Sequence, residues 1–271
     1  MNIASHPSED FRFDVRGYDI LQGALSPVQL KAINQWIDDH PVTGTGQWIG
    51  NVETQAFEKN DGVNYQNIIE GGAVFEELID NPHWIERAKR YIGITGLSIN
   101  EAFINVRGQG GHIGIHSGGH IPWFICSTKH HTGAWMCGQI NILVALNDIG
   151  PGDGATTLVP GSHKATHPHP ILSNPEGKLE VFKYGKPAGE AEGMIEAHLK
   201  AGEALMFTDG VCHGSSARTN PGHRRILIYR YSPANFVPRF NYVPSAELLS
   251  RLSPDRKRIV QPIPPRGPQG L

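Results

Sequence analysis

Short apolar runs separated by clusters of Gly, Pro, Asn and Asp dominate the chain after residue 95. This punctuation is typical of β-strands joined by turns. We predict strands at residues 98–106, 138–146, 155–159, 204–207 and 225–231. Because few helical patterns separate these segments, the strands should pair antiparallel in a mainly β fold, a sandwich or jelly roll that can hold a small ligand between its sheets.

Helical patterns lie mostly before this region. Ser26–Pro27 and Asn81–Pro82 each begin a predicted helix, because Ser and Asn cap helix N-termini and Pro fits the first turn. Apolar residues then recur at helical spacing: Leu30, Ile33, Trp36 and Ile37 in the first helix, and Trp84, Ala88 and Tyr91 in the second. We expect these helices to pack outside the sheet, with their aromatic residues in the core.

Composition and charge restrict the class of protein. The chain has 271 residues, of which 39% are hydrophobic, and we expect residues 1–271 to form one domain. Residues 234–271 should form a C-terminal extension with one helix at 245–252 and an extended or disordered Pro-rich end. The formal net charge is -2 without blocks of like charge, so we expect a small-molecule substrate rather than nucleic acid or membrane as partner.

Two further features indicate the cellular compartment. The N-terminus lacks a basic segment followed by an apolar stretch, and no run of 18 apolar residues occurs, so we expect a cytoplasmic protein. Three cysteines, Cys126, Cys137 and Cys212, lack CxxC spacing, which argues against a disulfide framework or a structural zinc site. Strand alternation would turn Cys212 away from the face of His213, so we assign it to packing.

The candidate chemistry centres on two histidines and an arginine. His116 lies in GIHSGGH, His213 lies in DGVCHGSS, and Arg224 follows eleven residues later. Two imidazoles and one carboxylate on one face are typical of non-haem Fe(II) oxygenases. The carboxylate normally comes two residues after the first histidine, where this chain has Gly118. A buried arginine in turn suits a bound carboxylate, so we predict a mononuclear metal site with an anion clamp.

Other metal and cofactor motifs fit poorly. His112, His116 and His120 are spaced by four, as in a zinc protease helix, but surrounding glycines disfavour a helix and the HExxH glutamate is missing. Ile113 occupies the third glycine position of a dinucleotide-binding fingerprint. Nothing resembles a general base beside a three-ligand zinc site, which disfavours a zinc hydrolase.

Two long segments carry a family resemblance. QINILVALNDIGPGDGATTLVPGSHK and LKAGEALMFTDGVCHGSSARTNPGHRRILIYRYSP resemble the phytanoyl-CoA dioxygenase family of Fe(II)- and 2-oxoglutarate-dependent oxygenases, over residues 104–233. The resemblance implies a double-stranded β-helix, also described as jelly roll or cupin-like, with flanking helices. It also implies Fe(II), 2-oxoglutarate and O2 as cofactors and co-substrates.

The resemblance also assigns roles to residues. His116 and His213 would bind iron, and Arg224 would bind the distal carboxylate of 2-oxoglutarate, with Arg225 as the fallback. Ser215 lies on the strand face of His213 and could bind the same carboxylate. Gln139 and Asn141 share a face of their strand and either point at the co-substrate or substrate or form a polar edge. His163, within VPGSHK, is expected to be structural.

Gly118 leaves three explanations open. A chloride or bromide ion could replace the carboxylate, as in radical halogenases. A water or a carboxylate from elsewhere, such as Asp209 or Asp153, could complete a hydroxylase site. Iron chemistry could also have been lost, leaving a non-catalytic jelly-roll binding protein. We favour a functional oxygenase that hydroxylates an unactivated C–H bond of a small molecule, with halogenation as the alternative.

The segment 120–137 is the best candidate for a substrate-facing lid. Trp123, Phe124 and Trp135 would stack on the substrate there or, equally, fix the loop to the core.

Overall fold

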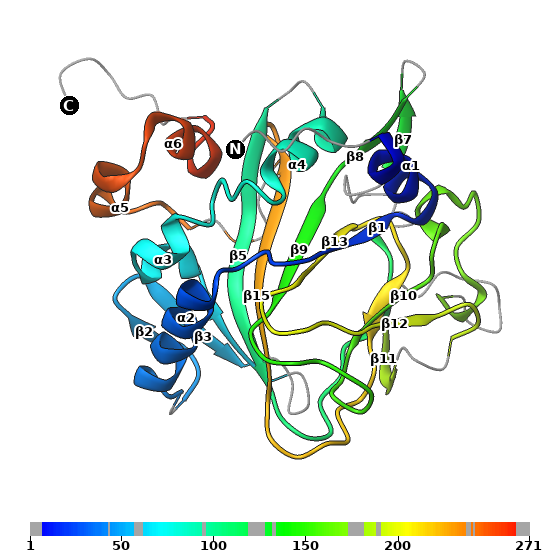
Figure 1. The fold of residues 1–271 in the computed structure, drawn as a ribbon, viewed down its shortest axis with the longest axis horizontal. Coiled ribbons are helices and arrows are strands. Elements are labelled where there is room, and N and C mark those ends of the chain that lie inside the picture. The colour runs from blue at the N-terminus through cyan, green and yellow to red at the C-terminus, as the bar shows by residue number, and fades with distance from the viewer. Residues whose placement is uncertain are drawn as a thin grey trace.

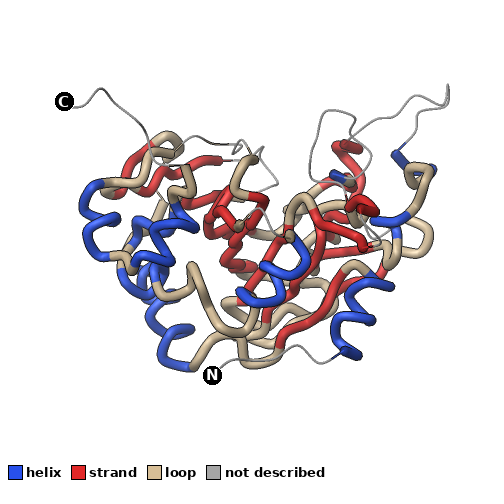
Figure 2. The backbone as a smooth tube through the Cα atoms, turned by 90° about the horizontal axis from the view of Figure 1, so that it is seen from above, coloured by secondary structure: helices blue, strands red, loops and turns tan. Residues whose placement is uncertain are grey.

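Two antiparallel sheets form the body of the protein in a computed structural model (Figure 1). The structure describes residues 7–42, 44–56, 62–93, 96–118, 128–131, 134–172, 182–187, 191–236, 240 and 242–263, without the side chains of 128–131, 134–136 and 182–187. Figures 1 and 2 show the larger sheet flanked by helices on one side and facing the smaller sheet on the other. This is the jelly roll that the strand pattern predicts.

The strands pair as follows. The larger sheet has the spatial order β1 (Tyr18–Leu21), β13 (Ala204–Thr208), β9 (Ile140–Ala145), β15 (Arg224–Pro233), β5 (Leu97–Arg107), β4 (Val63–Gln66), β3 (Val52–Ala56) and β2 (Gln47–Ile49). The smaller sheet has the order β11 (Phe182–Pro187), β6 (Gly114–His116), β14 (His213–Ser215), β10 (Thr156–Leu158) and β12 (Ile195–Ala197). A separate hairpin joins β7 (Thr128–His131) to β8 (Ala134–Cys137).

The helices and 3-10 turns lie mainly around the larger sheet. They are α1 (Pro7–Arg16), α2 (Pro27–Asp39), η1 (Ile68–Gly71), α3 (Ala73–Glu76), α4 (Ile85–Ile92), η3 (Ser162–Lys164), η4 (Pro170–Leu172), α5 (Ala246–Arg251) and α6 (Pro254–Val260). Ser26 caps α2 as predicted, through a capping box with Gln29. None of these described helices is long and apolar enough to cross a bilayer.

The central strands bury both of their faces. In β9, Ile142 and Val144 pack in the cluster beneath the helices, whereas Leu143 and Ala145 pack in a second cluster between the sheets. Successive strand residues point to opposite faces, so a nearly continuous apolar run is what such a strand requires. The inner face of β5 and β15 carries polar residues at both ends, Arg107 and Arg224 at one and Glu101 and Arg230 at the other, and the candidate site lies along this face.

The strand predictions are confirmed within one or two residues at the segments that became β5, β9, β10, β13 and β15. The second predicted helix begins later than expected, at Ile85 rather than Pro82. The cause is local: the side chain of Asn81 accepts a hydrogen bond from the His83 backbone and donates one to the Ala24 carbonyl, which stabilises a turn instead.

The C-terminal extension contains two helices rather than one. Ser253 caps α6, which follows α5 and was not predicted. Leu248 and Ile259 are buried in the cluster beneath the helices, and Arg251 forms an ion pair with Glu76 on α3. The described part of the extension therefore packs on the domain; the Pro-rich end, residues 264–271, lies outside the described residues.

The turn between α1 and β1 offers a stability test. Gly17 has a φ of 79°, and a Cβ there would lie 2.4 Å from Val211 and 2.5 Å from His163. We expect Gly17→Ala to lower the free energy of unfolding by about 2–4 kcal/mol, from left-handed strain and overpacking. Gly23→Ala is the matched control, because φ is 61° there and no atom lies within 4 Å. Urea denaturation should show only about 1 kcal/mol for the control; equal losses would contradict the packing argument.

Candidate active site

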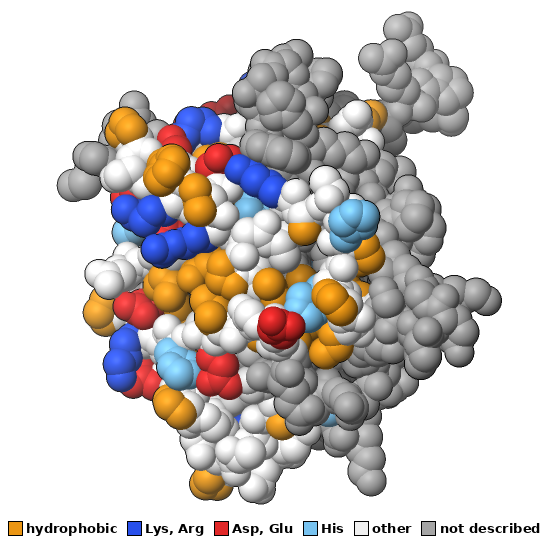
Figure 3. Space-filling view, turned by 90° about the vertical axis from the view of Figure 1, so that its right-hand side faces the viewer, with side chains coloured by type: hydrophobic (Ala, Val, Ile, Leu, Met, Phe, Trp, Pro, Cys, Tyr) orange, Lys and Arg blue, Asp and Glu red, His pale blue; other side chains and the backbone are white. Residues whose placement is uncertain are grey.

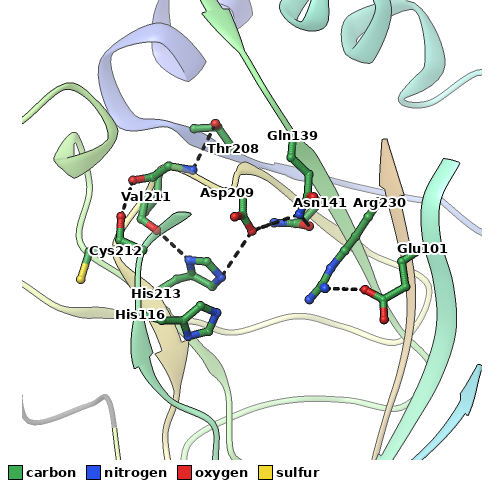
Figure 4. Close-up of polar contacts among 12 residues, drawn as sticks. Glu101, His116, Gln139, Asn141, Thr208, Asp209, Val211, Cys212, His213 and Arg230 are labelled. Atoms are coloured by element: carbon green, nitrogen blue, oxygen red, sulfur yellow. Dashed lines mark hydrogen bonds and ion pairs between the residues drawn. The ribbon is translucent and has the colours of Figure 1, made fainter. Parts of the chain in front are cut away.

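The two candidate metal ligands stand side by side across neighbouring strands. His116 ends β6, His213 begins β14, and the two residues are paired in the antiparallel register. Their rings lie 4.0 Å apart between centroids (Figure 4). Residues 97 positions apart in the sequence thus meet because two three-residue strands pair. His213 is 5% exposed, and both histidines line a cavity of about 160 Å³ between the sheets.

Backbone hydrogen bonds fix the tautomer of both rings. Nδ1 of His116 lies 2.8 Å from the carbonyl of Gly114, and Nδ1 of His213 lies 2.6 Å from the carbonyl of Val211. A carbonyl only accepts, so each Nδ1 carries a proton, and in a neutral ring Nε2 then carries the lone pair. Burial also lowers the pKa of His213, which favours the neutral ring. Neutral imidazoles oriented in this way are suited to metal ligation through Nε2.

Two buried arginines line the same cavity. Arg224 on β15 is paired directly opposite Arg107 on β5, and the two are 3% and 2% exposed. Arg224 donates a hydrogen bond of 3.0 Å to Thr156, whereas its buried Nε has no hydrogen-bond partner. Burial, together with the charges of Arg107 and Arg218, lowers the pKa of Arg224 well below its ordinary value. Like charges placed opposite each other on a sheet are destabilising, so this end of the cavity attracts an anion.

Arg225 points the other way. Its guanidinium contacts Asn34 and forms a 2.6 Å ion pair with Asp38 on α2. The strand alternation therefore leaves Arg224, and not the fallback Arg225, in the cavity. Ser215 also lines the cavity, where its hydroxyl accepts hydrogen bonds from Arg107 at 2.6 Å and from the Ile113 backbone at 2.7 Å.

A carboxylate fills the space beside Gly118. A Cβ built on Gly118 would lie 2.1 Å from Oδ2 of Asp209. The backbone N–H of Gly118 donates to the Asp209 carbonyl at 3.0 Å, which holds the two residues together. Oδ1 of Asp209 lies 4.0 Å from Nε2 of His213 (Figure 4). Gly118, where the sequence pattern predicts a carboxylate, is therefore next to a carboxylate from another segment.

Gln139 and Asn141 orient Asp209. Their side-chain amides donate to Oδ1 of Asp209 at 3.1 and 3.0 Å, and the predicted shared face is seen in this contact. The other candidate carboxylate, Asp153, is held away from the histidines by Arg218 at 3.1 Å and by Asn220. Of the two carboxylates considered from the sequence, only Asp209 is beside His213.

The side chains of His116, His213 and Asp209 do not yet surround a common metal position. Among the described residues, no three His, Cys, Asp or Glu side chains form a complete metal site. Donor atoms bound at right angles to one ion at about 2.1 Å lie about 3 Å apart. The 4.0 Å from Oδ1 of Asp209 to Nε2 of His213 exceeds that separation by about 1 Å. The two imidazoles lie side by side, and Oδ1 of Asp209 would have to come about 1 Å closer to share an ion with His213.

The comparison with known families decides the identity of the chain. The model of the phytanoyl-CoA dioxygenase (PhyH) family matches residues 13–226. The chain belongs to the PhyH family. Dioxygenase FUM3 of Gibberella moniliformis is 25% identical over 239 residues, which cover 82% of this chain and 69% of FUM3. Dioxygenase cdmD of Talaromyces verruculosus is 30% identical over 102 residues, only 37% of this chain and 28% of cdmD.

Solved structures share the fold of this PhyH protein. HygX from Streptomyces hygroscopicus, solved with nickel and 2-oxoglutarate bound, has a TM-score of 0.71 at 18% identity, covering 90% of this chain and 94% of HygX. The non-haem α-ketoglutarate-dependent epimerase SnoN has a TM-score of 0.56 at 16% identity, covering 83% of this chain and 80% of SnoN. At these identities the likeness establishes the jelly-roll fold alone.

Several other residues of the PhyH protein can now be placed. Cys212 is a buried free thiol on the face opposite His213, and burial raises its pKa to about 12, as expected for a packing role. His163 is buried, and its Nε2 lies 3.1 Å from the Asp14 carbonyl, away from the cavity. Trp123 and Phe124 lie outside the described residues, as does the side chain of Trp135 on β8; their predicted substrate contacts remain predictions.

The sequence analysis missed a set of polar residues that line the cavity. Glu101 and Arg230 form a 2.5 Å ion pair across β5 and β15, and Asn105 donates a 2.8 Å hydrogen bond to Asn64. Arg107 was also missed. The available signal was alternation: Glu101, Asn105 and Arg107 share one face of the strand with Phe103, and apolar residues lie between them.

The molecular surface is mixed in charge. Among the described residues of the face in Figure 3, basic side chains lie beside acidic ones, with apolar side chains between them. This distribution agrees with the balanced composition of the PhyH chain and offers no extended surface of a single sign on that face.

Proposed function

We propose that this protein is an Fe(II)- and 2-oxoglutarate-dependent oxygenase that hydroxylates an unactivated C–H bond of a polar small molecule. The observation that carries the proposal is the register of β5 and β15. It places Glu101 opposite Arg230, and these two form an ion pair. It also places Arg107 opposite Arg224, two like charges, in the cavity that the two imidazoles line. A cation site at one end and two guanidinium groups at the other match a dicarboxylate that binds a metal.

Each residue has a defined part in this proposal. His116 and His213 would hold iron through Nε2, and the guanidinium of Arg224 would bind the distal carboxylate of 2-oxoglutarate. Bound Fe(II), with 2-oxoglutarate and O2, supplies the oxidising power for C–H cleavage. The substrate gains one oxygen atom as a hydroxyl group, and 2-oxoglutarate takes the other to become succinate and CO2. The buried walls limit access of water to the reacting groups. HygX, which has this fold and binds 2-oxoglutarate, supports the choice of co-substrate.

Asp209 favours hydroxylation over halogenation. The carboxylate lies where a side chain on Gly118 would lie, so an anion of the protein already occupies the region that a halide would need. A second anion beside it would be repelled in a buried site, because like charges cannot both be compensated there. We therefore keep halogenation as the alternative outcome of the experiment.

The cavity walls favour a polar substrate. Asn64, Asn105 and the Glu101–Arg230 pair line the cavity beside apolar Phe103 and Ile228. The buried Nε of Arg230 has no hydrogen-bond partner. Buried polar groups gain when a ligand supplies hydrogen bonds, so a substrate rich in hydroxyl, amino or carboxyl groups would be preferred to a hydrocarbon.

An anaerobic titration tests this function first. We expect Fe(II) and 2-oxoglutarate to produce the visible charge-transfer band of the chelate, unchanged when chloride or bromide is added. Admission of O2 should then yield succinate and consume one O2 per succinate. A band that shifts with halide would indicate the halogenase alternative. Absence of both the band and succinate would contradict the oxygenase proposal and favour a binding protein.

A further inference from the structure

We propose that Asp209 is the third protein ligand of the metal, supplied from the turn before His213 instead of the position two residues after His116, and that Gly118 is glycine to make room for it. The inference rests on the proposed function, since it assumes that His116 and His213 hold a metal. It assigns a metal ligand where the familiar pattern of two histidines and a following carboxylate provides none.

Space is the first argument. Gly118 does not adopt a left-handed backbone conformation, so its φ does not explain the glycine. The nearest atoms to a Cβ on Gly118 would all belong to Asp209: Oδ2 at 2.1 Å, Cγ at 3.1 Å and the backbone oxygen at 3.1 Å. Even alanine at Gly118 would displace the carboxylate. Residue 118 therefore has no side chain at the place where Asp209 puts its carboxylate.

Charge is the second argument. Asp209 is 7% exposed, and among the described residues no lysine or arginine forms an ion pair with it. Its hydrogen bonds come from the neutral amides of Gln139 and Asn141. A buried carboxylate is costly without a compensating cation. The nearest group that could carry a compensating charge is His213, whose Nε2 lies 4.0 Å away, and a divalent ion shared with the histidines would supply that charge at shorter range.

The orientation of His213 is the third argument. Its Nδ1 donates to the Val211 carbonyl, so Nε2 is the ring nitrogen directed toward Oδ1 of Asp209. The two atoms lie 4.0 Å apart, which is longer than a direct hydrogen bond. A cation between them would be bound by both, whereas Asp153 has its own partner in Arg218. The amides of Gln139 and Asn141 would then orient the ligand oxygen, as supporting groups around metal sites do.

The test removes the carboxylate from position 209, or moves it to position 118, in the whole chain without metal. The affinity for Fe(II) alone, without 2-oxoglutarate, is measured anaerobically by competition with a chromophoric chelator in chloride-free buffer. We expect Asp209→Asn to weaken binding by at least about 100-fold, beyond the effect of changing a merely supporting residue. Asp153→Asn is the matched control and should change the affinity less than about 3-fold, since its carboxylate does not face the histidines.

The rescue variant makes the test specific. Gly118→Asp alone should weaken Fe(II) binding, because it places a second carboxylate against Asp209. The double variant Gly118→Asp with Asp209→Gly moves the carboxylate to the usual position, and we expect the affinity to return to within about 10-fold of the wild type. If Asp209→Asn does not fold, as judged by circular dichroism, Gly118→Ala gives the same readout by displacing the carboxylate.

The outcomes separate the two proposals. Unchanged Fe(II) affinity in Asp209→Asn, with wild-type protein that binds Fe(II) and forms succinate, overturns the inference and leaves the proposed function intact. The inference is also overturned if added chloride raises the Fe(II) affinity of the wild type and of Asp209→Asn alike. Wild-type protein that fails to bind Fe(II) at all overturns both proposals. Loss in Asp209→Asn with recovery in the double variant supports the inference.

Discussion

Replacing His213 with alanine should abolish Fe(II) binding and reduce succinate formation by more than about 100-fold. His213 lies against His116 with its Nε2 lone pair directed into the site, and its ring also packs edge-on against Phe207. The substitution removes one of the two candidate metal ligands. No other described histidine can replace it, because the second ring beside the site, His116, is already a candidate ligand on the paired strand β6. Fe(II) affinity of the apoprotein and succinate yield under saturating 2-oxoglutarate are the two measurements.

His163→Ala is the matched control for this substitution. His163 is likewise buried and likewise bonded to a backbone carbonyl, but it supports the turn at Gly17 and lies away from the cavity. We expect it to lower the free energy of unfolding by about 1–3 kcal/mol while leaving Fe(II) affinity unchanged. If both alanine variants bound Fe(II) as tightly as wild type, the two-histidine site would be wrong. If His213→Ala bound no metal yet still formed succinate, the link to catalysis would be wrong.

Local sequence patterns were sufficient for the strands that form the centre of the fold. β5, β9 and β15 are long enough for their apolar runs and flanking turn residues to be recognised. The strand that begins at His213 was expected from the turn residues before it, and β14 confirms it. The short strand β6 was not predicted, because three residues carry almost no periodicity and its pairing is set by the whole jelly roll. His116 on β6 was identified as a candidate ligand through its combination with His213 and Arg224, not through a strand pattern.

The carboxylate that we propose as the third metal ligand shows what sequence patterns leave open. Asp209 and Gly118 are 91 positions apart and belong to different turns, and nothing local to either residue indicates their contact. The sequence analysis left open a water or a carboxylate from elsewhere, with Asp209 and Asp153 as examples. The fold decided between them, since the Gly118 backbone pairs with Asp209 whereas Asp153 is engaged by Arg218. The Asp209 carboxylate can occupy this place only because residue 118 has no side chain there.

Arg107 was missed for a related reason. A charged residue at the end of an apolar strand is usually a solvated terminus, and only the pairing of β5 with β15 places it opposite Arg224. The resulting pair of like charges is costly to the protein alone and favourable to a bound dianion. On the proposed function, a carboxylate co-substrate would relieve a repulsion that the protein alone must bear.

Arg224→Met should raise the KM for 2-oxoglutarate by about 30- to 3,000-fold, since loss of one partner of a buried charged pair costs about 2–5 kcal/mol. The fall in kcat at saturating 2-oxoglutarate should be much smaller, because the guanidinium binds the end of the co-substrate remote from the reacting carbon. Arg225→Met is the matched control: the neighbouring arginine pairs with Asp38 on the outer face, so the KM should stay within about 3-fold of the wild-type value.

Thermal unfolding gives an independent measurement of the effect of Arg224→Met. Arg224 is buried beside Arg107, and burial lowers its pKa, so the charged guanidinium is disfavoured in the protein alone. Methionine at this position should therefore leave the apoprotein as stable as wild type or more so, by up to about 4 kcal/mol. Addition of 2-oxoglutarate at 100 times its Kd should stabilise wild type by about 2.7 kcal/mol and the variant hardly at all. A variant that lost apoprotein stability yet kept the wild-type response to 2-oxoglutarate would show that Arg224 supports the fold and not the co-substrate.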